Sequence, residues 1–258
     1  MSNQDALQQY EVSKYRTPDG YTSDIAVFTI VSEQIEIYKP SKMTMKLMLI
    51  KRSEFNSEGS PNIEAGKWAL PGGFVDENES GFEAAKRELE EETGVSGIHI
   101  KHFGSYDTPG RDPRGWMITN AHYAIVPQEY LAQRKANDDA AEVELFSLEE
   151  LSGLKLAFDH KDIIDDAIEV ITNDLLQTTV AKKFLPEQFT YSELQSVLMT
   201  VTDDPAIMSG EAFARKVKTL PFINEVEGKK TSRTSKRPTQ LYQFNDMKVV
   251  KSIYTARY

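Results

Sequence analysis

Short apolar runs in the first 150 residues have the composition of buried β-strands, because they are rich in β-branched and large apolar side chains. Such strands are predicted at 24–31, 44–50, 97–103, 116–126 and 142–147. The stretch 53–66 contains Asn, Ser, Gly and Pro, which predicts an exposed loop. The Pro-Gly-Gly sequence at 71–73 predicts a tight turn.

Two segments of the same region have the ends or the periodicity of α-helices. Ser80 and Glu83 have the spacing of a capping box, in which each side chain bonds the backbone of the other residue. A helix is therefore predicted to begin at Ser80, and Gly94 is placed to end it. Residues 161–176 predict an amphipathic helix, with one side formed by Ile163, Ile164, Ala167, Ile168 and Ile171.

The pattern changes after this amphipathic helix. A Lys-Lys-Phe-Leu-Pro stretch at 182–186 indicates a linker into a second, smaller unit. Thr190 and Glu193 form a second capping box and open a helix. Ser209 is placed to cap another helix, which is predicted to extend to about Leu220.

The end of the chain and its charge indicate a separate module. A strand is predicted at 241–244 with a basic loop before it, and two helices followed by a two-stranded ribbon form the plan of a winged helix. Residues 1–180 carry 17 basic and 32 acidic residues, a net charge of −15, whereas 181–258 carry 13 and 8, a net charge of +5. We therefore predict two domains, 1–180 and 181–258, with different partners. A basic block that only balances an acidic surface is an open alternative.

Composition narrows the class of protein. Of the 258 residues, 40% are hydrophobic and 27% are charged, which is typical of a soluble globular protein. The apolar runs are too short to span a bilayer, and the first residues lack the pattern of a signal peptide. The sequence contains no cysteine, which excludes disulfides, thiolate metal sites and cysteine nucleophiles. A cytoplasmic protein without a membrane partner is the resulting expectation.

Three glutamates gather on one side of the helix that begins at Ser80. Glu88, Glu91 and Glu92 stand at positions i, i+3 and i+4, so their carboxylates share an arc of about 100°. Like charges this close repel, and a hard divalent cation, Mg²⁺ or Mn²⁺, would compensate and could also polarise a phosphate and activate water. A bare run of glutamates, taken alone, would be interpreted as an ordinary solvated helix face. The adjacent apolar stripe that would hold the helix on a sheet consists of Phe82, Ala85 and Leu89.

The residues around these glutamates resemble the signature of the Nudix, or MutT-like, family without a gap. The matching positions are Gly73, Glu79, Arg87, Glu88, Leu89, Glu91, Glu92, Gly94 and Val95. The resemblance implies an α/β fold, a Nudix α/β/α sandwich with a mixed sheet, and hydrolysis of a nucleoside diphosphate linked to another moiety. It further implies that Glu88, Glu91 and Glu92 ligate the metal and that the Gly73 region adds a backbone carbonyl. Arg87 would brace the acidic cluster, and Glu79 would order the loop.

A general base lies outside this signature in many members of the family. Asp138, Asp139 and Glu142 are candidates for it, although all three also suit a charged surface. The four histidines show no metal-ligand spacing and are interpreted as structural, namely His99, His102, His122 and His160.

The segment Pro109–Trp116 offers groups that suit a nucleotide-like substrate. Arg111 and Arg114 could clamp phosphates or a carboxylate, and Trp116 could stack on a base or a ribose. A turn with a buried tryptophan is an equally open interpretation. Its Arg-Asp-Pro-Arg-Gly string resembles ADP-ribose pyrophosphatase-like Nudix proteins, especially the branch that includes transcriptional regulators of NAD metabolism. This resemblance implies ADP-ribose as the ligand.

The C-terminal module resembles the winged helix of those regulators at Phe184–Gln195 and at Phe213, Arg215 and Lys216. Glu211, Ala212 and Ala214 depart from the basic or polar residues usual there, which weakens the case for direct readout of bases. The loop 229–237 is rich in cations that suit phosphates or a minor groove, although a solvated hairpin tip is also possible. The candidate DNA-binding residues are Arg215, Lys216, Lys229, Lys230, Arg233, Lys236 and Arg237.

Two functions are compatible with this sequence. In the first, the chain is a metal-dependent Nudix hydrolase that cleaves ADP-ribose to AMP and ribose 5-phosphate, and its winged helix supports dimerisation or tethers it. In the second, it is an ADP-ribose-responsive transcriptional regulator of NAD metabolism in which hydrolysis is secondary. Binding to double-stranded DNA predicts a homodimer on a palindromic site.

Overall fold

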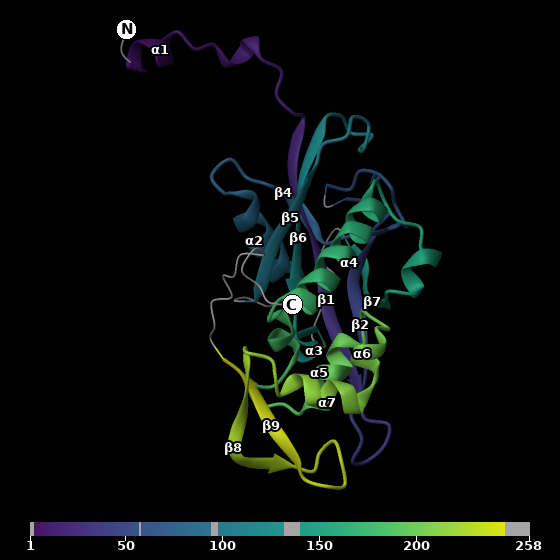
Figure 1. Cartoon of the computed structure of the whole chain (residues 1–258). Coiled ribbons are helices and arrows are strands. Elements are labelled where there is room, and N and C mark those ends of the chain that lie inside the picture. The colour runs from purple at the N-terminus through teal and green to yellow at the C-terminus, as the bar shows by residue number, and fades with distance from the viewer. Residues whose placement is uncertain (1–2, 57, 94–97, 132–139, 246–258) are drawn as a thin grey trace.

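The computed structural model describes residues 3–56, 58–93, 98–131 and 140–245, and in this part of the chain a mixed sheet of seven strands forms the centre of the molecule (Figure 1). The strands are β1 (Gly20–Glu33), β2 (Lys42–Arg52), β3 (Trp68–Ala69), β4 (Gly72–Phe74), β5 (His99–Tyr106), β6 (Met117–Ile125) and β7 (Ala140–Ser147). The five strands predicted from apolar runs are all present. The turn predicted at 71–73 was wrong in part, because Gly72 and Gly73 lie in β4, which pairs with β1.

Strand β1 is the centre of the sheet. It pairs in parallel with β6 and antiparallel with β2 and β4, and the main path runs β3-β2-β1-β6-β5. Strand β7 pairs with β2. A mixed sheet was predicted, and the parallel pair places the end of the β5–β6 loop beside the start of β1.

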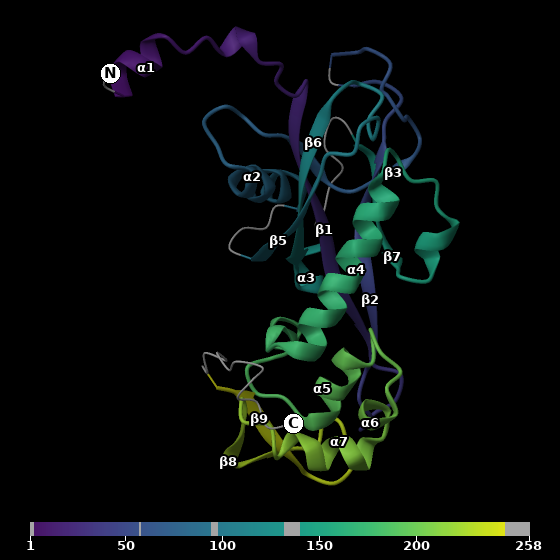
Figure 2. The ribbon, with the colours of Figure 1, turned by 45° about the horizontal axis from the view of Figure 1, so that its top comes forward.

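Helices cover both faces of the sheet. Successive side chains of β1 point to opposite faces, so each face of this strand packs against a different helix. Ile25 and Val27 pack against helix α2 (Gly81–Thr93), whereas Ala26 and Phe28 belong to the core cluster of helix α4 (His160–Gln177). The views in Figures 1 and 2 place these two helices on either side of the strands. The predicted α/β/α sandwich is therefore confirmed.

Both predicted helices form, and a local signal sets the start of the first. At the start of α2, the Ser80 N–H donates to Glu83 Oε2 at 2.8 Å and the Glu83 N–H donates to Ser80 Oγ at 3.2 Å, which is the predicted capping box. Gly94, predicted to end α2, lies outside the described residues. Helix α4 buries most of its predicted apolar side.

Several short helices were not predicted. They are α1 (Asn3–Gln8), the 3₁₀ helices η1 (Val12–Lys14) and η2 (Glu150–Gly153), α3 (Gln128–Leu131) and α6 (Pro205–Met208). The N-terminal segment with α1 extends away from the rest of the molecule in both views (Figures 1 and 2). Among the helices in the described part of the chain, none has the length and apolar composition that a membrane crossing requires.

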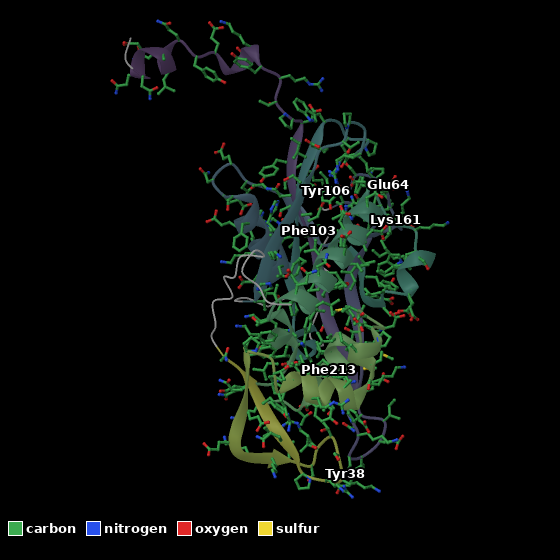
Figure 3. All side chains as sticks on the ribbon, viewed as in Figure 1. Tyr38, Glu64, Phe103, Tyr106, Lys161 and Phe213 are labelled. Carbon is green, nitrogen blue, oxygen red and sulfur yellow. The ribbon has the colours of Figure 1, made fainter. Side chains whose placement is uncertain are left out.

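The C-terminal unit has the predicted plan of helices followed by a hairpin. It consists of η3 (Val180–Phe184), α5 (Tyr191–Leu198), α6, α7 (Gly210–Val217), β8 (Ile223–Thr231) and β9 (Thr239–Phe244). The capping box of α5 forms as predicted, and Ser209 accepts from Ala212 N–H to cap α7, which ends at Val217 rather than near Leu220. In Figure 3, the labelled Phe213 lies among these helices.

Two expectations about this unit were wrong. The stretch predicted as a linker belongs mainly to η3, whose residues Val180 and Ala181 are buried. Lys229 and Lys230 lie in β8 and not in the loop before β9, because the strand continues to Thr231. The division after residue 180 stays a prediction, because the core is continuous across it.

The β1–β2 hairpin packs against the C-terminal unit. Ile30 and Met45, near the hairpin end of these strands, share one core cluster with Phe189 and Leu194 of the C-terminal unit. Figure 2 shows the hairpin beside α5 and α6. The C-terminal unit is therefore seated on the sheet by apolar contacts as well as by the covalent connection.

Candidate active site and nucleic-acid interface

Helix α2 presents its acidic residues away from the sheet because its other side is anchored in the core. Ala85 and Leu89, two of the three positions of the predicted apolar stripe, are buried, and so is Ala84. Phe82, the third, is 46% exposed and meets the ring of His122 edge-on, so its predicted core position was wrong.

Arg87 connects the acidic side chains around the start of α2. Its guanidinium donates to Glu79 at 2.6 and 3.2 Å and to Glu88 at 2.7 Å, and it lies 3.6 Å from a carboxylate oxygen of Glu91. It also donates to the carbonyl of Phe74 at 3.1 Å, which ties α2 to the end of β4. This is the bracing arrangement that the family resemblance implied for Arg87.

The two carboxylates that Arg87 holds differ in their proton affinity. Hydrogen bonds from Arg87 and from the Asp76 N–H lower the pKa of Glu79, so this side chain stays ionised and holds its loop in place. The pKa of Glu88 is raised, because burial together with repulsion from Glu91 and Glu79 outweighs the hydrogen bond and the charge of Arg87. A half-buried carboxylate of this kind is stabilised in its charged form by a further cation.

Gly73 leaves the space that the Glu88 carboxylate occupies. A Cβ at this position would lie 2.2 Å from Glu88 Oε1, so no larger residue fits without moving that carboxylate. The strand β4 brings Gly73 here by pairing it with Ser23 of β1. The backbone of β4 and the carboxylate of Glu88 therefore meet at one point.

These residues fit a hard divalent cation. They supply carboxylate oxygens from Glu88 and Glu91 and a nearby backbone at Gly73, the oxygen donors that Mg²⁺ and Mn²⁺ prefer. Glu92 lies in α2, but its side chain is outside the described residues. Among the side chains that are described, no three acidic or histidine groups lie close enough to hold an ion. A complete metal site would therefore need Glu92 as well, which is one of the three glutamates predicted to ligate the metal.

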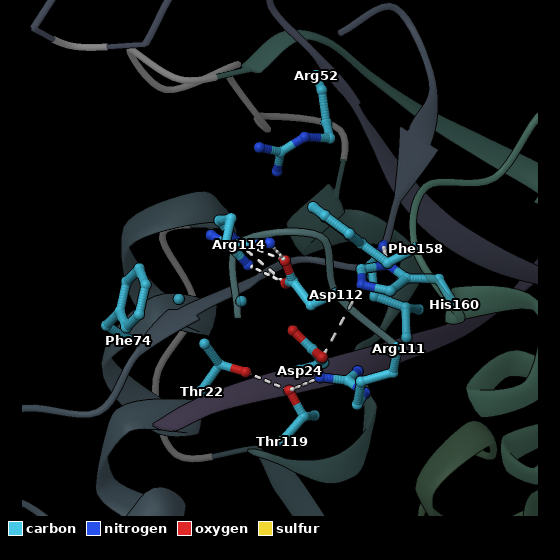
Figure 4. Close-up of a pocket in the computed structure, with 13 residues that line it drawn as sticks. Thr22, Asp24, Arg52, Phe74, Arg111, Asp112, Arg114, Thr119, Phe158 and His160 are labelled. Carbon is cyan, nitrogen blue, oxygen red and sulfur yellow. Dashed lines mark hydrogen bonds and ion pairs between the residues drawn. The ribbon is translucent and has the colours of Figure 1, made fainter. Parts of the chain in front are cut away.

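A cavity lined by arginines adjoins this acidic site, and we call it the arginine cavity (Figure 4). It consists of two adjoining spaces of about 70 and 500 Å³, which share Arg52, Gly72, Gly73, Phe74 and Arg114. Because Gly73 belongs to both the cavity wall and the acidic site, a ligand in the cavity can reach the glutamates. The wall of the smaller space is completed by Thr22, Asp24, Leu70, Arg111, Asp112, Thr119, Phe158 and His160.

The two arginines predicted to bind substrate both line the smaller space, but their side chains differ in exposure. The side chain of Arg111 is only 4% exposed, and it donates to both carboxylate oxygens of Asp159 at 2.6 and 2.7 Å. Arg114 is more exposed and bonds Asp112 at 2.6 Å. Burial raises the pKa of Asp112, but hydrogen bonds from Arg114 outweigh it and the pKa is lowered. Both guanidiniums are therefore held in position by carboxylates.

Aromatic residues other than the predicted one face the cavity. Trp116 is 39% exposed and lines neither space; its ring lies 5.9 Å from the guanidinium carbon of Arg16. Phe158 lies close to two guanidiniums, with Arg52 at 5.2 Å and Arg114 at 5.1 Å from its ring centre. Its φ of +50° is rare for a non-glycine residue, and such conformations gather at functional sites. Sequence reasoning missed Phe158, because neither this φ nor its neighbours can be read from its local sequence.

His160 also lines the cavity, although it was interpreted as structural. Its Nδ1 accepts the Leu70 N–H at 2.9 Å, so the neutral ring carries its proton on Nε2, which lies 3.9 Å from Asp24 Oδ2. Burial lowers its pKa and keeps the ring neutral. One nitrogen therefore has the expected structural role, and the other faces the cavity as a donor.

The candidates for a general base are only partly described. Asp138 and Asp139 lie outside the described residues. Glu142 lies in β7, where a hydrogen bond with Glu144 and the ammonium of Lys51, 3.3 Å away, lower its pKa. It lines neither part of the arginine cavity.

The candidate DNA-binding residues divide into two groups. Arg215 and Lys216 are exposed in the last turn of α7, whose opposite side is anchored by the buried Phe213 and Val217. Lys230, Lys236 and Arg237 are exposed on the hairpin of β8 and β9, as is Lys229, whose Nζ lies 3.5 Å from Gln188 Oε1.

Arg233 differs from the other cations because it is held by the protein. Its guanidinium donates to both carboxylate oxygens of Glu193 at 2.7 Å and to the Gln188 carbonyl at 2.8 Å. Glu193 is also the capping residue of α5, and the buried Thr234 bonds Thr190 at the same helix end. The loop before β9 is thus fastened to α5 and is not a free hairpin tip.

Family models match both parts of this chain. The NUDIX domain model matches residues 37–167, and the model of the NrtR DNA-binding winged helix domain matches residues 181–244. The Acinetobacter baylyi "ADPR responsive transcriptional repressor NtrR" is 30% identical over 245 residues, covering 94% of this chain and 88% of that protein. The Methanocaldococcus jannaschii "ADP-ribose pyrophosphatase" is 42% identical over 121 residues, which are 47% of this chain and 64% of that protein.

Solved structures of Shewanella oneidensis NrtR resemble both the whole chain and its first domain. The complex of that protein with a 27mer DNA aligns with a TM-score of 0.65 at 28% identity, covering 87% of this chain and 93% of that chain. Its NUDIX domain in complex with ADP ribose aligns with a TM-score of 0.52 at 26% identity, covering 66% and 99%. This chain therefore belongs to the Nudix family, to the group in which the Nudix domain is followed by an NrtR-type winged helix.

Proposed function

We propose that this protein is a Nudix hydrolase that uses Mg²⁺ or Mn²⁺ to cleave ADP-ribose to AMP and ribose 5-phosphate. The observation that carries this proposal is the junction at Gly73, where the Arg87-braced glutamates meet the arginine cavity. Glu88, Glu91 and Glu92, with the backbone near Gly73, would hold the cation. When bound, it would polarise a phosphate oxygen and lower the pKa of a water molecule.

The chain's own residues supply binding and orientation. Arg114 and Arg52 can donate to the diphosphate, because both line the larger space and lie close to the ring of Phe158. The rings of Phe74 and Phe158 offer faces for the adenine or the ribose. We assign Arg111 to a positioning role, since its guanidinium is buried against Asp159. In this proposal, the two phenylalanines take the stacking role that was predicted for Trp116.

The choice of ADP-ribose is supported by the relatives. The Methanocaldococcus protein is named for the hydrolysis of ADP-ribose, and the Shewanella domain binds it in a crystal. Two arginines beside an aromatic ring, Arg52 and Arg114 at Phe158, also suit a diphosphate between two sugars better than a bare sugar phosphate.

Hydrolysis is tested with purified protein, Mg²⁺ and ADP-ribose, with chromatographic separation of AMP and ribose 5-phosphate. We expect both products in equal amounts, and a Glu92→Gln variant should lose turnover by orders of magnitude while its melting temperature stays near that of the wild type. Preferential cleavage of a nucleoside triphosphate would remove ADP-ribose from the proposal. Unchanged turnover in Glu92→Gln would remove the metal assignment.

A second function is supported by the C-terminal unit. We propose that it binds double-stranded DNA through α7 and the β8–β9 hairpin and that ADP-ribose controls this binding in a homodimer. The exposed cations at the end of α7 and on the hairpin carry this proposal, together with the likeness to a repressor and to a DNA complex.

DNA binding is tested by a gel shift with the DNA upstream of the protein's own gene, with and without ADP-ribose. We expect retardation at low salt, a steep loss of affinity as salt increases, and release by ADP-ribose. Light scattering on the free and bound protein gives the number of subunits. Absence of retardation at low salt would leave the hydrolase proposal alone.

A further inference from the structure

A second cavity lies where the Nudix domain joins the connection to the winged helix, and we call it the junction cavity. Its volume is about 370 Å³, within the range of small-molecule sites. It shares no residue with the arginine cavity. Figure 2 shows α4 running from the Nudix sheet toward this connection. The cavity is lined by His99, Lys101, Tyr123, Asp174, Thr178, Thr179, Val180, Lys182 and Lys183.

The junction cavity is positively charged in a negatively charged protein. Three lysines, at 101, 182 and 183, face one carboxylate, Asp174, which gives a local charge of +2 in a chain of net charge −10. Asp174 is already satisfied, because its Oδ2 accepts from Lys101 Nζ at 2.6 Å and from the Tyr123 hydroxyl at 2.5 Å. The excess positive charge therefore belongs to Lys182 and Lys183.

These two lysines have no counter-ion in the described part of the chain. Both are exposed, and no carboxylate among the described residues lies within ion-pair distance of either. The charge of Lys183 also acts on His99, which lines the cavity: burial lowers the pKa of His99, and the charge of Lys183 lowers it further. Helix η3 fixes the backbone of both lysines, because its residues Val180 and Ala181 are buried.

We propose that the junction cavity binds a small phosphorylated anion, inorganic phosphate or a phosphate monoester, between Lys182, Lys183 and the edge of β5. Two lysine ammoniums match the two negative charges of a phosphate monoester, and Thr179, which also lines the cavity, has a hydroxyl that can donate. A bound phosphate would join the end of α4, strand β5 and η3. It would thereby stiffen the connection to the winged helix.

A small molecule fits this cavity better than a DNA backbone does. Tyr123 is fully buried and His99 is partly buried. A phosphate on a duplex can meet the exposed ends of the lysines, whereas a small anion in this open space of about 370 Å³ can also approach the ring of His99, which lines it. The proposal is independent of catalysis, although AMP and ribose 5-phosphate both belong to the proposed ligand class.

Histidine NMR tests the proposal, because His99 reports on the junction cavity and His160 reports on the arginine cavity. Inorganic phosphate, ribose 5-phosphate and AMP are titrated into the full-length protein at constant ionic strength, with ribose and adenosine as neutral controls. We expect a saturable shift of the His99 resonance with at least one phosphate compound and none with the neutral compounds. The pKa of His99 should also rise on binding, since the anion offsets the lysine charges.

Matched charge variants locate the site. Lys182→Gln/Lys183→Gln should weaken the His99 response at least tenfold, whereas Lys42→Gln/Lys155→Gln, with the same loss of charge at exposed positions outside the cavity, should leave it unchanged. Equal weakening in both variants would reduce the effect to overall charge and overturn the proposal. Duplex DNA is titrated as a further arm. A His99 shift that appears with the duplex and with none of the small phosphate compounds would assign the lysines to a DNA contact, and would also overturn the proposal. A response of His160 alone would place phosphate binding in the arginine cavity instead.

Discussion

The contact between Gly73 and Glu88 allows a prediction that separates catalytic geometry from folding. In Gly73→Ala, the new Cβ would lie 2.2 Å from Glu88 Oε1, whereas an ordinary contact needs at least 3.4 Å, so the carboxylate must move by about 1.2 Å. The carboxylate is the far end of a flexible side chain, and Gly73 does not need a positive φ. The fold can therefore accept the methyl group by moving Glu88.

The displacement should be costly for the reaction. A misplacement of about 1 Å in a catalytic group reduces rates by about 100-fold, which corresponds to about 2.7 kcal/mol of transition-state stabilisation. We therefore expect kcat for ADP-ribose to fall about 100-fold in Gly73→Ala. More Mg²⁺ should also be needed for half-maximal activity, because Glu88 would no longer be in the ligand position.

The assay measures AMP release across a magnesium titration, with thermal unfolding of each variant in parallel. Gly153→Ala is the matched control, because a Cβ at Gly153 meets nothing within 4 Å and its backbone needs no positive φ. It should keep wild-type turnover. If Gly73→Ala hydrolyses ADP-ribose as fast as the wild type with the same magnesium requirement, Glu88 does not act from its observed position.

Three further predictions concern the winged helix and the effect of pH. Arg215→Gln/Lys216→Gln should weaken duplex binding without changing hydrolysis, and the slope of log affinity against log salt should become shallower by about one unit for each DNA phosphate that the variant no longer neutralises. Glu193→Ala should lower the free energy of unfolding by about 1–2 kcal/mol in a urea titration, because the lost carboxylate both caps α5 and accepts the fork of Arg233; an unchanged midpoint would contradict this. Burial lowers the pKa of His122 from 6.5 to about 4, so the unfolded chain takes up the proton first. The stability due to its neutral ring is present above pH 6.5 and is lost as the pH falls toward 4, and the loss of unfolding free energy between pH 7 and pH 5 should be smaller in His122→Gln than in the wild type.

The features that were predictable from the sequence are those set by local interactions. The capping boxes at Ser80 and Thr190 need only residues three positions apart, and both form in the structure. Apolar runs locate the central strands, because a buried strand needs apolar residues along its whole length. The acidic arc of α2 is likewise a consequence of helical periodicity alone.

Contacts between distant segments could not be predicted. Arg111 was predicted to bind the substrate, and its ion pair with Asp159, 48 residues further along the chain, was not foreseen. Arg233 was predicted to bind DNA, and its ion pair with Glu193, 40 residues earlier, was not foreseen either. A cation in a loop and a carboxylate on a remote helix carry no mutual signal in one sequence, so only the fold reveals that they pair.

Helix α4 provides residues to both cavities, and its length decides how they could influence each other. His160 lines the arginine cavity and Asp174 lines the junction cavity, 14 residues apart on the same helix. At 1.5 Å per residue the separation along the axis is about 21 Å, about twice the distance over which exposed charges remain unscreened at physiological salt, roughly 8 Å to 10 Å. Direct attraction or repulsion between ligands in the two cavities is therefore negligible. Coupling between them, which would be equal in both directions, has to pass through the position of α4 and its packing on the sheet.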